Sequence, residues 1–136
     1  KHINNMDRKL QFRGKPLDYD PMTMPKWMTG FYHQELYGGR MLHLITDGAT
    51  TFEVDPDTIG QYTGLCDKNG TEIYEGDIVK YYDDIEDEFV LGEVYYDPDV
   101  CSFLIRRKYT DNDKLTVYWQ HEVVGNIHDN SGLLNT

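Results

Sequence analysis

The chain has 136 residues and a formal net charge of −11, with 13% aromatic and 27% charged side chains. This length suits about one domain, which can bury a hydrophobic core without support from disulfides or metal. The aromatic content excludes a disordered chain, and the negative charge disfavours general binding to the phosphate backbones of nucleic acids.

Basic side chains concentrate near the start of this acidic protein. Residues 1–27 carry six basic and three acidic side chains, whereas residues 28–136 carry seven basic and 21 acidic side chains. A basic arm of this kind is either a solvated terminus or a contact with a neighbouring subunit. We interpret Lys1 to Asn5, which precede Met6, as residues added to the natural chain and exclude them from fold reasoning.

The sequence contains no apolar run long enough to span a membrane, and its start lacks the apolar region of a secretory signal. We therefore expect a cytoplasmic protein. Cys66 and Cys101 form no CxxC pair, so we expect free thiols rather than a zinc site or a disulfide.

The first half of the chain predicts strands, because apolar and polar residues alternate with period two. A first strand is expected from Arg8 to Arg13, followed by a proline-rich connection. Strands from Trp27 to Tyr37 and from Arg40 to Thr46 flank Gly38-Gly39, which favours a tight hairpin turn. A short strand is expected from Thr51 to Asp55.

The second half predicts a series of short strands that turn residues separate. These strands run over Ile59–Leu65, Glu72–Glu75, Ile78–Tyr82, Phe89–Tyr96, Cys101–Lys108, Lys114–Gln120 and Glu122–His128. Short strands and tight turns at this spacing are typical of a small antiparallel barrel. We expect an all-β protein, or a mainly β one with little helix. Residues 6–57 would form an irregular β-hairpin region and residues 58–136 an SH3-like barrel, either as two regions or as one continuous domain.

Two segments, VDPDTIGQYTGLCDKNGTEIYEGDIVKY (Val54–Tyr81) and HEVVGNIHDNSGLL (His121–Leu134), resemble the paired signatures of the YopX-like family. RKLQFRGK (Arg8–Lys15) is similar to the opening strand of that family. The first segment is specific, because the blocks IGQYTGL, DKNG and EGDIV occur in order. The family consists of small proteins carried mainly by phages, prophages and plasmids. The resemblance implies a fold that contains a β-barrel, and it assigns no enzymatic activity and no catalytic residue.

The sequence departs from the family pattern at two places. Cys66 stands where members usually carry a lysine, and Ser131-Gly132 stands where a Pro-Glu pair is usual. The resemblance therefore gives the thiol no role, and it says little about Pro16 to Thr51, a region that varies in such proteins.

The residues to which we assign roles are architectural. We expect three groups: a bend into the barrel at Gly60, Tyr62, Gly64 and Leu65; a first corner at Tyr74, Gly76, Asp77, Ile78 and Val79; and a closing strand at Val123, Val124, Gly125 and Ile127. Asp77 is expected to accept hydrogen bonds from backbone N–H groups of its turn. No catalytic, metal-binding or cofactor-binding residue is assigned, and no cofactor is expected.

Candidate metal ligands occur in the predicted hairpin. His33, Glu35 and His43 offer three ligands, the minimum for a catalytic zinc site. Counted from the glycine turn, however, Gln34 pairs with His43 and His33 falls one step out of line. We favour surface or cross-strand histidines, with a metal-dependent hydrolase as the alternative.

Two further groups are weaker candidates. His121 and His128 lie at opposite ends of the last predicted strand. The acidic run Asp83 to Glu88 lacks the spacing of a calcium loop, so we expect a solvated, mobile loop, with an acidic docking surface or a calcium site as alternatives. Neither cysteine lies in a nucleophile motif, and the sequence contains no GxSxG elbow or glycine-rich phosphate loop.

The most basic patch is Arg106-Arg107-Lys108, beside Tyr109, but in a strand Arg107 points away from its two neighbours. Barrel tyrosines can stack the bases of a single strand, or they can pack the outer layer of a barrel or a subunit contact. The candidate nucleic-acid contacts are Arg106, Tyr82 and Tyr95.

The resemblance implies a protein encoded by a phage or prophage, and together with the residues it predicts an accessory protein without catalytic activity. It would act through contacts with itself, as a homo-oligomer, or with a phage or host protein. The many tyrosines and the opposite charges of the first 27 residues and the remainder favour self-association. The alternative is a nucleic-acid-binding regulator that uses a tyrosine-rich barrel face, which the net charge disfavours.

Overall fold

The computed structural model describes residues 9–107, 113–115 and 120–135. Its regular structure consists of antiparallel strands and short 3-10 turns, which confirms the predicted all-β class. No helix in the described ranges is both long and apolar enough to cross a membrane. The chain forms two compact units, Lys1–Tyr62 and Thr63–Thr136, each with its own core.

The first unit contains a sheet in the order β4-β3-β2-β1-β5. Its elements are β1 (Phe12–Gly14), β2 (Met28–Tyr37), β3 (Arg40–Thr46), β4 (Thr51–Glu53), the 3-10 turn η2 (Pro56–Thr58) and the first part of β5 (Gly60–Cys66). The predicted hairpin is present, and β3 has the predicted bounds. Gly38 and Gly39 have positive φ angles of 58° and 80°, which the two-residue turn between β2 and β3 requires.

The core of this unit lies on one face of the sheet. Met28, Ile45 and Val54 are buried, and four partly buried apolar side chains pack against them: Phe12, Tyr32, Phe52 and Ile59. Period-two alternation explains why these side chains form the core. Met28 and Tyr32 share one face of β2, and Ile45 lies directly opposite Tyr32.

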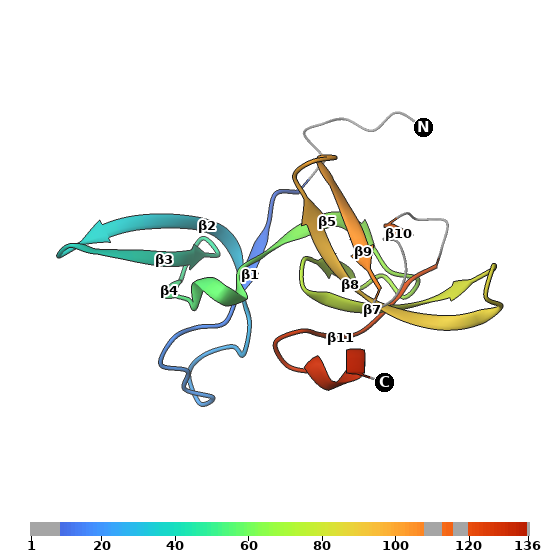
Figure 1. Ribbon diagram of the computed structural model, residues 1–136. Coiled ribbons are helices and arrows are strands. Elements are labelled where there is room, and N and C mark those ends of the chain that lie inside the picture. Colours follow the sequence, from blue (N-terminus) through green and yellow to red (C-terminus); the bar gives the residue numbers. More distant parts are fainter. Residues whose placement is uncertain (1–8, 108–112, 116–119, 136) are drawn as a thin grey trace. The chain divides into compact units, whose positions relative to one another are not determined.

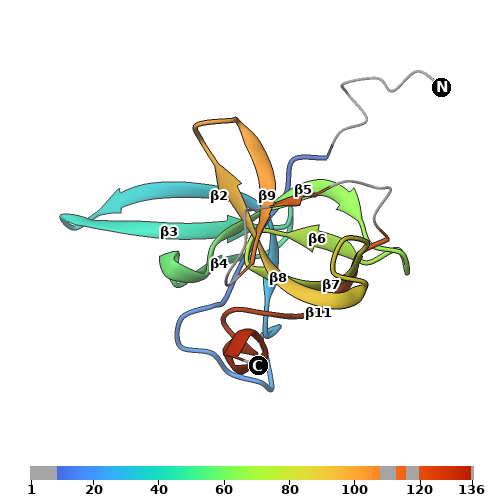
Figure 2. The ribbon, with the colours of Figure 1, turned by 45° about the vertical axis from the view of Figure 1, so that its right-hand side comes forward.

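The second unit contains a sheet in the order β10-β9-β8-β7-β11, preceded by β6, which neighbours β5. Its elements are β6 (Glu72–Tyr74), β7 (Asp77–Asp83), β8 (Glu88–Asp97), β9 (Ser102–Arg106), β10 (Asp113–Lys114), β11 (Glu122–Asn126) and the 3-10 turn η4 (Ser131–Asn135). The long strands β7 and β8 curl, as Figures 1 and 2 show. The described strands form a half-barrel whose outer members are β10 and β11.

The core of the second unit lies on one face of this curled sheet. Ile73, Val79, Tyr81, Val94 and Ile105 are almost completely buried. Because β7, β8 and β9 each contribute alternate residues, the opposite set of side chains lies on the outer face of the sheet.

Several predicted strand ends differ from the observed ones by one or two residues, as strand ends commonly do. The predicted first strand is shorter in the structure, since β1 begins only at Phe12 and Arg8 lies outside the described residues. Residues 1–5, Lys108, Tyr109 and residues 116–119 of the predicted strand Lys114–Gln120 also lie outside them. The predicted division after residue 57 falls shortly before the observed one, which lies within β5.

Candidate functional site

The β2–β3 hairpin is a long two-stranded element of the first unit, and no other strand of the described residues lies beside most of it. β1 pairs only with Met28 to Gly30 of β2, and β4 pairs only with Leu44 to Thr46 of β3. Residues 31–37 of β2 and residues 40–42 of β3 therefore extend as a bare ribbon, visible in Figure 1. We call residues 31–42 the hairpin arm.

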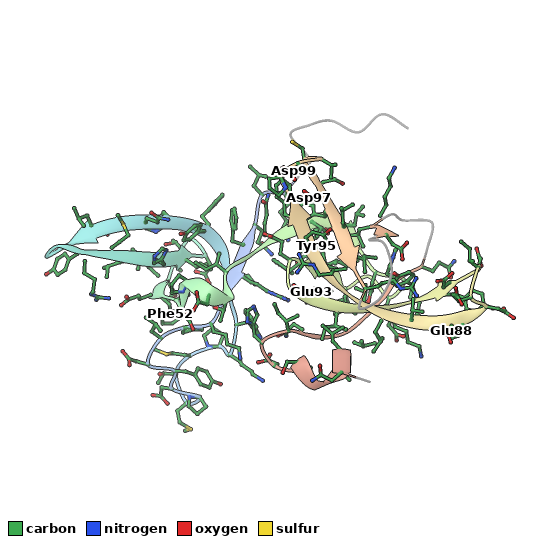
Figure 3. All side chains as sticks on the ribbon, viewed as in Figure 1. Phe52, Glu88, Glu93, Tyr95, Asp97 and Asp99 are labelled. Carbon is green, nitrogen blue, oxygen red and sulfur yellow. The ribbon has the colours of Figure 1, made fainter. Side chains whose placement is uncertain are left out.

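The hairpin arm exposes large apolar side chains on both of its faces. Phe31, Leu36, Tyr37 and Met41 are 69%, 71%, 75% and 45% exposed. Leu36 and Met41 lie directly opposite each other on one face, while Phe31 and Tyr37 share the other. Side chains stand on both sides of the arm in Figure 3. Removing apolar groups of this size from water is favourable, so the arm is a candidate contact surface.

The backbone along the outer edge of β2 is also open. The C=O of His43 accepts a 2.9 Å hydrogen bond from the N–H of Val54, so the backbone groups of His43 point away from β2. Gln34 lies directly opposite His43, and its own N–H and C=O must therefore point away from β3. By the same alternation, Tyr32 and Leu36 direct their backbone groups to this edge, where the described residues supply no further strand.

The proposed zinc ligands do not converge. His33 and His43 lie on opposite faces of the hairpin, because His33 pairs with Leu44 and His43 pairs with Gln34. Nδ1 of His43 is 2.8 Å from the hydroxyl of Tyr32, and Nε2 of His33 is 3.2 Å from the hydroxyl of Thr46. Nδ1 of His33 also lies 3.8 Å from a carboxylate oxygen of Glu35. Within the described residues no group of His, Cys, Asp or Glu side chains has the arrangement of a metal site.

The candidate nucleic-acid residues share the outer face of the second sheet. The guanidinium of Arg106 lies 4.0 Å from the ring centre of Tyr95, and it is 3.8 Å from the carboxylate of Glu93. Glu93 and Tyr95 follow each other along β8 (Figure 3). Tyr82 lies on the same face but forms an edge contact with Phe89, whose ring also carries the ammonium of Lys80 at 4.9 Å.

Arg107 points to the other side of β9, as the sequence predicts. Its guanidinium is 2.7 Å from Asp83 and 3.5 Å from Asp113, and the hydroxyl of Tyr81 donates a 2.5 Å hydrogen bond to Asp113. Burial and the bond to Asp113 raise the pKa of Tyr81 well above its usual value, and the hydrogen bond from Arg107 lowers the pKa of Asp83. This cluster links β7, β10 and the residue that follows β9 through one guanidinium held between two carboxylates.

Asp83 also corrects the prediction for the acidic run. It is buried, it ends β7, and its Oδ1 accepts hydrogen bonds from the N–H groups of Ile85 and Glu86. It therefore forms the β7–β8 turn and does not belong to a solvated loop, unlike the exposed residues 84–88 that follow. Cys66 and Cys101 form no disulfide with each other, and both are exposed.

Asp67 is a structural residue that sequence reasoning treated only as part of a turn. Its Oδ1 accepts hydrogen bonds from the N–H groups of Asn69 and Thr71, and its Oδ2 accepts a 2.9 Å bond from Val123 in β11. The carboxylate thus ties the β5–β6 turn to the last strand. Burial acts to raise the pKa of Asp67, but the three N–H donors outweigh it and the pKa is lowered.

The architectural residues predicted from the sequence fall into two places. Gly60, Tyr62, Gly64 and Leu65 lie along β5. The residues of the predicted corner and closing strand meet at the β7–β11 pairing, where Val79 pairs with Val123 and Ile78 with Gly125 across a bulge that contains Val124.

Hydrogen bonds reinforce this corner. The N–H of Gly76 donates to Val94, and the C=O of Gly76 accepts from the N–H of Ile127. Asp77 is buried and accepts a 2.8 Å bond from the N–H of Tyr74, a bond of the kind that the sequence predicts.

The sequence reasoning missed the partners of Arg107 and the bond from Val123 to Asp67, because these partners come from strands far apart in the chain. A signal was present for Arg107, since alternation places it on the inner face, where an unpaired guanidinium is costly. The apolar residues at the arm carry no such signal, because alternating apolar residues equally predict a half-buried strand.

Comparison with known proteins agrees with the sequence signatures. A family model described as YopX protein matches residues 27–135. The crystal structure of protein EF1440 from Enterococcus faecalis is similar at a TM-score of 0.46 and 24% identity, over 93% of this chain and 98% of that one. None of the curated proteins matches the chain. The match over residues 27–135 establishes that the chain belongs to the YopX family.

Proposed function

We propose that this protein is a non-catalytic accessory protein, encoded by a phage or prophage, that acts through protein contacts made by the hairpin arm. The phage or prophage origin rests on the resemblance of the sequence to YopX-like proteins. The contact role rests on one observation above all: a bare two-stranded ribbon presents Phe31, Leu36, Tyr37 and Met41 to solvent on its two faces. Aromatic and methionine side chains in such positions are typical of the centres of protein interfaces.

The polar clusters favour a structural role over a reaction centre. Arg107 is held between two carboxylates, and the three N–H donors around Asp67 leave that carboxylate committed to the turn and to β11. Catalytic acids and bases need a pKa near the working pH. The shifts at Asp67, Asp83 and Tyr81 move each pKa away from neutrality instead.

The experiment is affinity capture of the tagged full chain from cells that carry the phage or prophage. We expect the wild-type protein to retain specific partners, the untagged chain included, and the double variant Leu36→Ser/Tyr37→Ser to lose them. The control is Tyr96→Ser, which removes a 41% exposed tyrosine from the second unit. Equal capture by the wild-type protein and the arm variant would contradict the role of the arm.

A second candidate is binding of single-stranded nucleic acid by the outer face of the second sheet. The observation in its favour is that Arg106, Tyr95 and Tyr82 share this face, with the guanidinium of Arg106 stacked over Tyr95. Against it, residues 63–136 carry six basic and 16 acidic side chains, which repel a phosphate backbone.

The two functions differ in their dependence on salt. We expect no binding of single-stranded oligonucleotides at physiological salt. Binding in low salt that weakens steeply as salt rises, and that Arg106→Ala and Tyr82→Ala abolish while Arg40→Ala does not, would favour the second candidate.

A further inference from the structure

We infer that the partner of the hairpin arm is a second copy of this chain, which pairs with it edge to edge along β2. This inference rests on the proposed function and names the occupant of the same surface. Its geometry follows from the seven residues, 31–37, that border the open edge.

The edge is suited to accept another strand. Tyr32, Gln34 and Leu36 direct their N–H and C=O groups outward, and β1 covers the edge only as far as Gly30. Open edges of natural sheets are usually protected by lysine, proline, a bulge or short length. Residues 31–37 contain neither lysine nor proline, and they pair with β3 in continuous register.

The sequence of this edge is complementary to itself in one antiparallel register. Gln34 is the centre of the seven residues, and a two-fold axis there pairs Gln34 with its own copy. The same axis places Phe31 against Tyr37 of the second copy and His33 against Glu35. Tyr32 then faces Leu36.

The chemistry of each pair is favourable in this register. Phe31 and Tyr37 form an aromatic pair, and His33 meets a carboxylate. Both pairs fall at non-hydrogen-bonded positions, where side chains of neighbouring strands come closest. The outward backbone groups of Tyr32, Gln34 and Leu36 then form about six hydrogen bonds between the two strands.

Neighbouring registers lose this match. An axis at His33 sets the two histidines against each other, and an axis at Glu35 sets two carboxylates directly opposite, which is destabilising. Either shift also leaves part of the open edge unpaired, because residues 31–37 are symmetric about Gln34 alone. The register centred on Gln34 buries Phe31, Leu36 and Tyr37, which are 69%, 71% and 75% exposed in the single chain.

The first test is the mass of the full chain in solution by light scattering over a range of concentration. We expect a dimer at tens of micromolar and dissociation on dilution. Leu36→Lys should give a monomer, because Leu36 faces Tyr32 of the second copy. Ile85→Lys should leave the dimer, because Ile85 is a 92% exposed apolar residue of the β7–β8 turn and is not part of the arm.

The second test fixes the register by disulfide formation in a background of Cys66→Ser and Cys101→Ser. In the inferred dimer the two copies of residue 34 have Cα atoms about 5.5 Å apart, within disulfide range. The two copies of residue 36 are offset by about 13 Å along the strands. Mild oxidation should therefore give a covalent dimer of Gln34→Cys and none of Leu36→Cys.

Each outcome has a clear reading. A monomeric wild-type chain at tens of micromolar, a dimer that Leu36→Lys leaves intact, or a crosslink at residue 36 in place of 34 would overturn the inference. If the wild-type chain is monomeric but capture from cells still depends on the arm, the self-pairing is wrong and the proposed function stands. If the arm variants change neither mass nor capture, both are wrong.

Discussion

Asp67 shows how a single carboxylate can organise several strands. Three backbone N–H groups donate to it, two from its own turn and one from Val123 of β11. An asparagine at this position keeps one acceptor oxygen but turns an N–H donor toward one of these N–H groups. We expect Asp67→Asn to lower the free energy of unfolding by about 1–3 kcal/mol at neutral pH.

The cost of Asp67→Asn should depend on pH. The pKa of Asp67 lies below its ordinary value of 3.8 in the folded protein, so its ionised form stabilises the fold above that value. As the pH falls through the folded pKa, this stability is lost, and the difference between wild type and variant should shrink. Denaturant unfolding of both proteins at neutral and at strongly acidic pH measures this difference in the free energy of unfolding.

A matched control for Asp67 exists in the first unit. Asp47 accepts hydrogen bonds from Ala49 and Thr50 in a similar turn, but it is exposed and has no bond to a distant strand. Asp47→Asn should have a smaller effect. Equal effects of the two substitutions, or a difference for Asp67→Asn that is independent of pH, would contradict the role of Asp67.

Gly92 is a second residue whose identity the packing explains. A Cβ atom there would lie 2.3 Å from Cγ2 of the buried Ile105, because β8 and β9 meet closely at the core. We expect Gly92→Ala to cost about 1–3 kcal/mol of unfolding free energy through overpacking. Gly132→Ala is the control, since a Cβ there would contact nothing. Thermal or denaturant unfolding of both variants measures this cost. A Gly92→Ala variant as stable as the wild type would contradict the close contact.

At the scale of the element, the β2–β3 hairpin was the most predictable part of the chain. Alternation and the Gly38-Gly39 turn together fixed its register, because a two-residue loop leaves only one pairing of Tyr37 with Arg40. The strand bounds were less predictable, since β1 and β10 are short and owe their pairing to neighbours that sequence patterns do not identify.

Proline substitution can test which backbone groups of β2 face the edge. Gln34 directs its N–H outward, so Gln34→Pro should leave the hairpin folded and prevent dimer formation. Glu35 directs its N–H toward Leu42 of β3, so Glu35→Pro removes a ladder bond and should lower the free energy of unfolding by about 1–3 kcal/mol. Unfolding measured at protein concentrations at which the wild-type chain is monomeric separates the effect on folding from the effect on association. Equal destabilisation by the two prolines would contradict the assigned backbone directions.

At the scale of the whole molecule, composition and alternation sufficed for the all-β class, because they report burial on one face of each strand. They did not suffice for the candidate site. An exposed apolar residue and a buried one look alike in a sequence, and Ile45 differs from Leu36 in that other core side chains pack against it. The family signatures likewise concentrate in residues 54–81 and 121–134, apart from the arm.

The measurement that tests the central claim most directly is amide hydrogen exchange along β2 at two protein concentrations. In dilute protein, the account predicts slow exchange at His33 and Glu35, which bond to β3, and fast exchange at Tyr32, Gln34 and Leu36. At high concentration the second set should become protected as well. Protection of that set at every concentration would mean that the edge is covered within one chain. Fast exchange of it at every concentration would mean that no second copy pairs there.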